Sequence, residues 1–373
     1  MPQPTYPAAR AVAATVAAHF ARHLETTEDR DSAEAACAPD AAAVESIIDA
    51  AFWASLRREE GRAPRVSLAL LPPGRARHTL VFADRMPLGP AMLAKVAPAV
   101  ERPGIHLGVW RDGHDYYVWG TTRDVPAFCL VVEVVASGLL VVKHRNEPFG
   151  KFVNVAVLEG DQIKIVDEKG GTAVPDCPAL VSSLLGSVDR PIAAGVNAVL
   201  VLMAASMRQH GRGGALLVVP HRSDRWRESV VTPLTYAISP PFSELAELMH
   251  GPDPDPDDLK RAVDAIAGLT AVDGATIIND RYDVLAFGAK IMRRRGSPQV
   301  EQVNVTEPVE ASVAMRATPS QLGGTRHLSA AQFVHDQRDA TALVASQDGR
   351  FTIFKWSPRE QFVHAHRVDA LLL

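Results

Sequence analysis

The chain has 373 residues, of which 47% are hydrophobic and 22% charged, and its formal net charge at pH 7 is −4. This is the composition of a globular protein too long for one ordinary core, so we expect two domains, 1–180 and 181–373. The balanced charge provides no basic field for holding a polyanion, so we do not expect nucleic acid as a partner.

The cysteines bear on the cellular compartment. Cys37, Cys129 and Cys177 lie far apart and form no CxxC or Cys/His metal pattern. Such spacing suits free thiols in a reducing compartment, and the sequence therefore predicts a cytoplasmic protein.

Two apolar stretches, 8–25 and 192–207, have to be distinguished from membrane spans. In the first, apolar residues recur every four positions from Val12 to Leu24 and polar residues interrupt them, which is typical of an amphipathic helix. The second is shorter than the about 20 apolar residues that a spanning helix needs. It predicts a buried core helix, with a partner-facing helix as the alternative, and we expect no membrane contact.

The rest of the amino-terminal half changes from helix to strand patterns. A helix is expected over 45–62, and strand patterns begin after the Pro72-Pro73-Gly74 break. Two β-rich runs surround Asp112-Gly113, a strong hairpin signal. The pattern predicts an α+β domain with a mainly antiparallel sheet.

The carboxy-terminal half mixes both kinds of element. It suggests a helix to about 209, a turn at 210–214, a buried strand over 214–220 and a helix near 240–250. Pro256 is expected to be the first residue of another helix, and Asp255 before it is expected to be the N-cap. Two hairpins, 275–291 and 341–354, complete a predicted mixed β-sheet or barrel flanked by helices, so the fold class is α+β throughout (mixed α/β).

The stretch QLGGTRHLSAAQF, residues 321–333, places two glycines before a helical pattern. Thr325 is expected to cap a helix that begins at Arg326. Glycines there allow close backbone approach to a ligand, and the free N–H groups of a helix start attract phosphate. Arg326 adds a planar donor fork, and His327 adds a donor or a titratable group. An ordinary capped helix with solvated side chains is the alternative, which this stretch alone favours.

A second motif, Asp273-Gly274-Ala275, opens an apolar strand. An aspartate at the rim of a buried strand suits a divalent cation beside a triphosphate, because magnesium uses one or two protein carboxylates together with substrate oxygens. The alternative is a simple turn, as at 112–113 and 348–349.

Together the two motifs resemble the diadenylate cyclase (DAC, DisA_N-type) domain, whose marks are a DGA tripeptide and a downstream GTRHR stretch. The resemblance covers roughly 190–373 and includes the strand pattern of DATALVASQDGRFTIF. The amino-terminal half resembles the sensor domains of the DACNV type that accompany divergent DAC domains.

The resemblance implies condensation of two ATP molecules to cyclic di-AMP with release of pyrophosphate. Each 3′-hydroxyl attacks the α-phosphate of the opposite ATP, so a homo-oligomer with face-to-face active sites is implied. Mg²⁺ or Mn²⁺ is the implied cofactor, and the ligand of the sensor domain stays open. Such phosphoryl transfer needs mainly positioning and charge neutralisation.

The resemblance also implies residue roles. The implied catalytic residues are Asp273, Arg326 and His327. Asp273 would bind the metal and help to activate the hydroxyl. Arg326 would hold phosphate, and His327 would support these residues. Asp348 would be a second metal carboxylate, although an Asx turn explains it equally well. The nucleotide contacts would be Gly274, Ala275, Gly324, Thr325 and Ser346.

Departures from the family pattern leave a second function open. Leu328 stands where the family has a second arginine, and Gln347 replaces an acidic residue of the later turn. The linker between the two motifs also looks longer than usual. Loss of one charge-assisted phosphate contact costs about 1.5–3 kcal/mol. A weak or inactive DAC-like domain that binds adenine nucleotides or cyclic dinucleotides is therefore the alternative, and coincidence of both motifs is a third reading.

Overall fold

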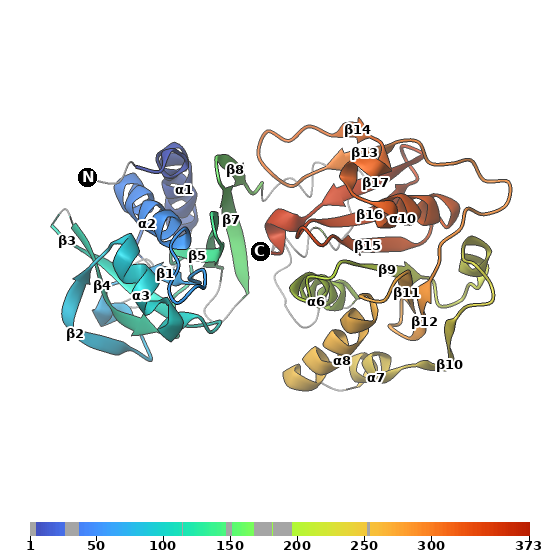
Figure 1. Cartoon of the computed structure of the whole chain (residues 1–373), viewed down its shortest axis with the longest axis horizontal. Coiled ribbons are helices and arrows are strands. Elements are labelled where there is room, and N and C mark those ends of the chain that lie inside the picture. Colours follow the sequence, from blue (N-terminus) through green and yellow to red (C-terminus); the bar gives the residue numbers. More distant parts are fainter. Residues whose placement is uncertain are drawn as a thin grey trace. The chain divides into compact units, whose positions relative to one another are not determined.

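The computed structural model describes residues 5–26, 37–113, 115–146, 151–167, 181, 196–251 and 254–373 (Figure 1). The chain divides into two compact units, Met1–Val166 with Leu373, and Asp167–Leu372. The predicted boundary near residue 180 lies outside the described residues. Helices and strands occur in both units, each around a sheet of its own, which confirms the α+β class.

The first unit is an eight-stranded sheet with helices packed on it, in the strand order β2-β4-β3-β1-β5-β6-β7-β8. Among the described strands of this unit, only β1 and β3 pair in parallel, and the other pairs are antiparallel. Along β1, Leu68 and Leu70 join the core under the helices, while Ala69 and Leu71 join a smaller core on the other face, the alternation expected of a strand buried on both sides. The elements are α1 (Pro7–Thr26), α2 (Ala41–Ser55), β1 (Ser67–Leu70), β2 (Leu80–Pro87), α3 (Pro90–Val100), β3 (His106–Asp112), β4 (Asp115–Thr122), β5 (Val131–Ala136), β6 (Leu139–Arg145), β7 (Phe152–Glu159) and β8 (Gln162–Ile165).

Most sequence predictions for this unit are confirmed, with one shift. The amphipathic helix is α1, and its Val12, Val16 and Phe20 are buried. The Asp112-Gly113 hairpin joins β3 to β4. The predicted 45–62 helix is α2, which begins earlier because the Asp40 carboxylate caps it by accepting from Ala43 N at 2.7 Å, and which ends earlier than predicted, at Ser55.

The second unit is a nine-stranded mixed sheet in the order β10-β12-β11-β9-β15-β16-β17-β13-β14. The β9–β11 and β13–β17 pairs are parallel. Within the described residues β10 and β14 end this order and do not pair with each other, so the sheet is open and not the barrel that was the other expectation. The elements are α6 (Val196–Gln209), β9 (Gly214–Val219), β10 (Tyr236–Phe242), α7 (Glu244–His250), α8 (Pro256–Leu269), β11 (Ala275–Asn279), β12 (Val284–Ala289), β13 (Val303–Thr306), β14 (Met315–Ala317), α9 (Pro319–Leu322), α10 (Thr325–Asp336), β15 (Thr341–Ala345), β16 (Phe351–Ser357) and β17 (Phe362–Arg367).

The predicted elements of this unit are largely found. Both hairpins form, as β11–β12 and β15–β16, and α8 begins at Pro256 behind the Asp255 cap. The expected 192–207 helix appears as α6, and residues 192–195 lie outside the described residues. The helix expected near 240–250 is α7, which begins only at Glu244, because the preceding residues form the unpredicted strand β10. This strand lies at the sheet edge, where its Pro240-Pro241 pair is tolerated.

The strand directions bring four chain segments to one end of the sheet. Gly214 at the start of β9 pairs with Ala345 at the end of β15, and Ala275 at the start of β11 pairs with Ala289 at the end of β12. Because β9 and β11 are parallel and their outer neighbours antiparallel, two strand starts and two strand ends lie together. Helix α10 packs across β9, β15, β16 and β17. None of the described helices is long and apolar enough to cross a membrane.

Candidate functional site

A pocket of about 240 Å³ lies at this end of the second sheet. Asp273, Gly274 and Ala275 line it from the start of β11, and Thr325 and Arg326 line it from the start of α10. The two sequence motifs, about 50 residues apart, therefore converge on one cavity. The other lining residues, which sequence reasoning did not find, are Ala215, Ala289, Lys290, Ile291 and Ser329.

Gly274 explains how Asp273 reaches the pocket. Its φ is +104°, and a Cβ at this position would lie 2.5 Å from the carbonyl carbon of Gly288 on β12. Only glycine allows both this backbone conformation and this approach. The loop is thereby pressed against β12, and Asp273 is exposed with no partner for its carboxylate among the described residues.

The start of α10 differs by one residue from the prediction. Gly324, not Thr325, is the N-cap, and the helix begins at Thr325. No side chain caps this end, and a Cβ on Gly324 would meet nothing within 4 Å. Uncapped N–H groups at a helix start combine with the positive dipole end to favour an anion.

Arg326 is the strongest polar feature of the pocket. Its Nε is buried without a hydrogen-bond partner, and no described carboxylate pairs with its guanidinium. Its Nη1 lies beside the turn before β9, 3.1 Å from where a Cβ of Gly213 would stand. A buried N–H group without an acceptor is costly, so this side chain is suited to receive the oxygen of a ligand.

The charge of the lining favours an anionic ligand. Arg326 and the exposed Lys290 supply two cations against the single carboxylate of Asp273. A phosphate group would meet both cations and the open helix start, while the carboxylate remains able to hold a divalent cation.

His327 lies outside this lining. It is 1% exposed, with its Nε2 3.4 Å from Thr352 Oγ1 on β16. Burial lowers its pKa to about 4. Its ring presses on Gly323, where a Cβ would lie 2.3 Å from Nδ1. His327 therefore holds the glycine loop and the helix start in place as a neutral group, instead of facing the cavity.

Ser346 and Asp348 also lie outside the pocket lining. Ser346 is half-buried after β15, and its backbone N–H donates to Arg350 O at 2.8 Å. The Asp348 carboxylate is exposed, accepts from Arg350 N at 3.3 Å and pairs with Arg350 Nε at 3.4 Å. Its observed contacts are those of the Asx turn, the alternative to a second metal ligand.

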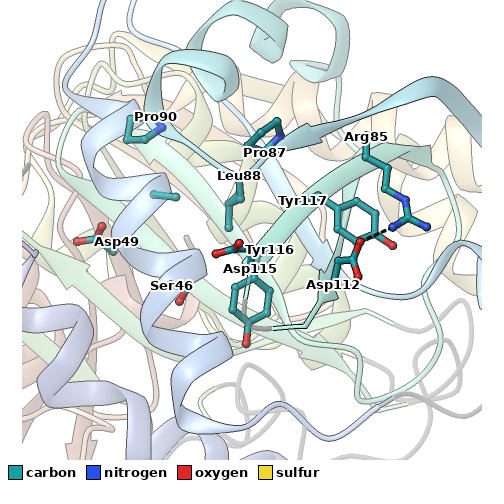
Figure 2. Close-up of a pocket in the computed structure, with 11 residues that line it drawn as sticks. Ser46, Asp49, Arg85, Pro87, Leu88, Pro90, Asp112, Asp115, Tyr116 and Tyr117 are labelled. Carbon is teal, nitrogen blue, oxygen red and sulfur yellow. Dashed lines mark hydrogen bonds and ion pairs between the residues drawn. The ribbon is translucent and has the colours of Figure 1, made fainter. Parts of the chain in front are cut away.

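The first unit contains a larger and more open pocket, of about 810 Å³ (Figure 2). Arg85 of β2 reaches across it: Nη1 donates to Asp112 Oδ2 at 2.7 Å, and the guanidinium lies 4.6 Å from the centre of the Tyr117 ring. Sequence reasoning missed this site because its lining comes from segments with no motif in common. The lining residues are Ser46, Asp49, Ala50, Arg85, Pro87, Leu88, Pro90, Asp112, Asp115, Tyr116 and Tyr117.

Unlike the pocket of the second unit, this one is acidic. Asp49, Asp112 and Asp115 outnumber Arg85, whose charge Asp112 already compensates. Asp49 also accepts from the backbone N–H of Tyr6 at 2.6 Å. The two pockets therefore differ in the sign of the ligands that they favour.

Substitutions of Gly274 and Gly324, the two glycines of the second-unit site, should have opposite effects on the free energy of unfolding. Gly274→Ala should destabilise the second unit by more than about 1 kcal/mol, because alanine resists this positive φ and would collide with Gly288. Gly324→Ser is the matched control: its side chain enters open space and adds a cap, so the free energy of unfolding should stay equal or rise by up to about 1 kcal/mol. Chemical denaturation followed by tryptophan fluorescence measures both. Equal stabilities for the two variants would contradict this account of Gly274.

Buried histidines predict a pH dependence. Burial lowers the pKa of His327 to about 4 and that of His366 to about 3, from an ordinary 6.5. Between pH 6.5 and 4 the unfolded chain binds protons that the folded unit excludes, so stability falls as the pH is lowered, by about 1.4 kcal/mol per pH unit for each ring. His327→Gln should remove one ring's share of the slope and His366→Gln the other. Denaturation curves across this range check it, and a variant slope equal to the wild-type slope would refute it.

Comparison with known proteins bears on the first unit. Residues 33–123 match the family model of the probable sensor domain DACNV. No curated protein matches the chain. All lining residues of the acidic pocket, from Ser46 to Tyr117, lie within the matched residues, so the pocket belongs to the part of the chain that is similar to a probable sensor domain.

Proposed function

We propose that the chain is a diadenylate cyclase of the cytoplasm, in which a sensor domain controls the condensation of two ATP molecules to cyclic di-AMP and pyrophosphate. One observation carries the proposal: the DGA residues and Thr325 and Arg326 of the GTRH motif, distant in the sequence, line one pocket with an unpaired arginine and a free carboxylate. Coincidental motifs would have no reason to converge.

The pocket supplies what phosphoryl transfer requires. Arg326, Lys290 and the open start of α10 would bind the triphosphate and offset its charge, and Thr325 adds a hydroxyl there. A bond forms between the 3′-oxygen of one ATP and the α-phosphorus of the other, the bond to the β-phosphate breaks, and pyrophosphate leaves. Asp273 lies in the lining as the group able to draw the proton from the attacking hydroxyl. His327 is a positioning residue, since it contacts the loop and not the cavity.

The donor set fits one divalent cation. Mg²⁺ and Mn²⁺ prefer oxygen ligands and accept a single protein carboxylate when substrate phosphates complete the shell. Asp273 would hold the ion, which neutralises phosphate charge when it is bound. Asp348 lies outside the lining, so the described residues support one carboxylate ligand and not two.

The size of the pocket fits a shared site. Its about 240 Å³ is below the about 300–1,000 Å³ typical of small-molecule pockets. An ATP bound here would extend beyond it, toward the nucleotide of a second chain. The proposal therefore includes a homo-oligomer whose pockets face each other, as the reaction of two ATP molecules requires.

A second function, nucleotide binding without turnover, has its own support. Leu328 provides no second cation, and Asp348 makes an Asx turn with Arg350. Gln347 is bound to the turn before β9, where its Nε2 donates to Arg212 O at 3.4 Å. A site with one metal carboxylate and one arginine binds a nucleotide more readily than it stabilises a transition state.

The full chain incubated with ATP and Mn²⁺ should yield cyclic di-AMP, measured by mass spectrometry. Asp273→Asn should lower the rate at least about a hundredfold, because it removes the charge that holds the metal and draws the proton. Asp280→Asn is the control, a half-buried aspartate just after the other end of β11 whose carboxylate accepts from His221 N at 2.9 Å, and it should keep the wild-type rate. No product at any chain concentration, combined with saturable ATP binding by calorimetry, would replace the cyclase with the binding function; no binding would remove both.

Restoring the family residues separates a weakened enzyme from a repurposed fold. Leu328→Arg with Gln347→Glu should raise the rate roughly tenfold to hundredfold, the effect of one added charge-assisted phosphate contact in the transition state. Leu328→Lys with Gln347→Glu is the control for charge without the planar donor fork, and should gain less. A lower rate in both variants would show that the site does not use a cation at position 328.

A further inference from the structure

Three histidines of the first unit bring their ring nitrogens together. His19 and His23 lie on α1, His144 lies on β6, and one ligand atom of each ring is within 4.8 Å of the other two. From this geometry we propose that the unit binds a transition-metal ion, Zn²⁺ by preference, through His19, His23 and His144. The proposal does not depend on the cyclase activity, and these residues lie outside the matched range 33–123.

The spacing is that of a chelating pair with a third ligand. Residues four apart on a helix share a face, and two histidines so placed are a recurrent zinc-binding pair. His19 Nε2 lies 3.1 Å from His144 Nε2. Two nitrogens bound at about 2.0–2.1 Å to one tetrahedral ion are about 3.3 Å apart. The observed separation therefore needs an adjustment of only a few tenths of an ångström.

The cluster is surrounded by aromatic rings. His19 is 7% exposed, His144 is fully buried and His23 is half-buried. The Phe128 ring stacks on His23 at 5.4 Å between ring centres and lies 5.1 Å from His144, and Phe20 meets His144 edge-on at 5.5 Å. This packing holds the three rings in place.

Phe128 provides a second observation. Its φ is +54°, a left-handed conformation that a bulky aromatic residue rarely adopts, and its backbone N–H donates to Arg145 O at 2.8 Å. Backbone strain of this kind persists where the surroundings impose it, and it concentrates at functional sites. Here it directs the ring onto two of the three histidines.

The donor set selects the ion. The described residues of this cluster supply imidazole nitrogen alone, which suits Zn²⁺, Co²⁺, Ni²⁺ and Cu²⁺ and does not suit Mg²⁺ or Ca²⁺. Three protein ligands leave one tetrahedral position for water or a small molecule. An ion bound here would link α1 to the sheet. The unit that contains residues 33–123, which are similar to a probable sensor domain, would then respond to a metal ion.

The test is metal binding by the full chain after removal of metals with a chelator. Titration with Zn²⁺ against a chromophoric chelator should give one ion per chain and raise the thermal midpoint, and Co²⁺ should show the visible absorption of a tetrahedral site. His23→Gln, the least buried ligand, should lower the affinity by more than the about 10–100-fold that loss of an outer-shell partner costs. His78→Asn is the matched control, an exposed histidine with φ +51° that asparagine tolerates, and should bind as the wild type does.

Two results would overturn the site. In the first, the wild type binds no Zn²⁺ and the histidines form only a hydrogen-bonded network. In the second, His23→Gln and His78→Asn change the affinity equally. If a variant does not fold, nitrogen NMR of the histidine rings in the wild type provides the test. Zn²⁺ should shift the ring nitrogen resonances of His19, His23 and His144 and leave those of His78 unchanged.

Discussion

The parallel pairing of β9 with β11, between antiparallel β12 and β15, is the constraint on which the second unit depends. It brings two strand starts and two strand ends to the same end of the sheet. Glycines make the approach close enough: a Cβ on Gly274 would collide with Gly288, and one on Gly214 would lie 2.6 Å from Thr270 Oγ1. The DGA motif is thus needed first for backbone packing, and the placement of Asp273 is its consequence.

The chemistry of the site follows from what the fold leaves unpaired. Asp283, at the opposite end of β11, has its carboxylate bonded to Ser243 and Asn279. At the pocket, Arg326 Nε is buried without an acceptor and Asp273 is free among the described residues. A folded chain tolerates such groups where a ligand completes them. The neutral His327 behind the loop keeps the helix start in place without adding charge to the pocket.

The first unit, part of which is similar to a probable sensor domain, contains two different candidate binding sites. The acidic pocket around Arg85 is open, lies within the matched residues and suits a soluble ligand with positive charge or several hydrogen-bond donors. The histidine cluster is buried, lies outside the matched residues and suits a metal ion. The pocket would select a ligand by shape and charge across several elements, and the cluster, as proposed, by the coordination preference of its nitrogen donors.

Most local elements of both units could be predicted from neighbouring residues, although strand β10 could not. Alternating apolar residues around Asp112-Gly113 and the Asp255-Pro256 cap predict structure from neighbours in the chain, and those elements are present. Of the residues that line the second-unit pocket, the sequence also predicted those that belong to the two short motifs, namely Asp273, Gly274, Ala275, Thr325 and Arg326. Their convergence, the exclusion of His327 from the cavity and the Asx turn at Asp348 were decided by the tertiary structure, because they depend on strand order and burial. The same holds for the histidine cluster: His19 and His23 look like interruptions of an apolar helix face until β6 brings His144 to them, more than a hundred residues later. Local propensity acts over one or two turns, whereas a site requires long-range pairings that no single segment encodes.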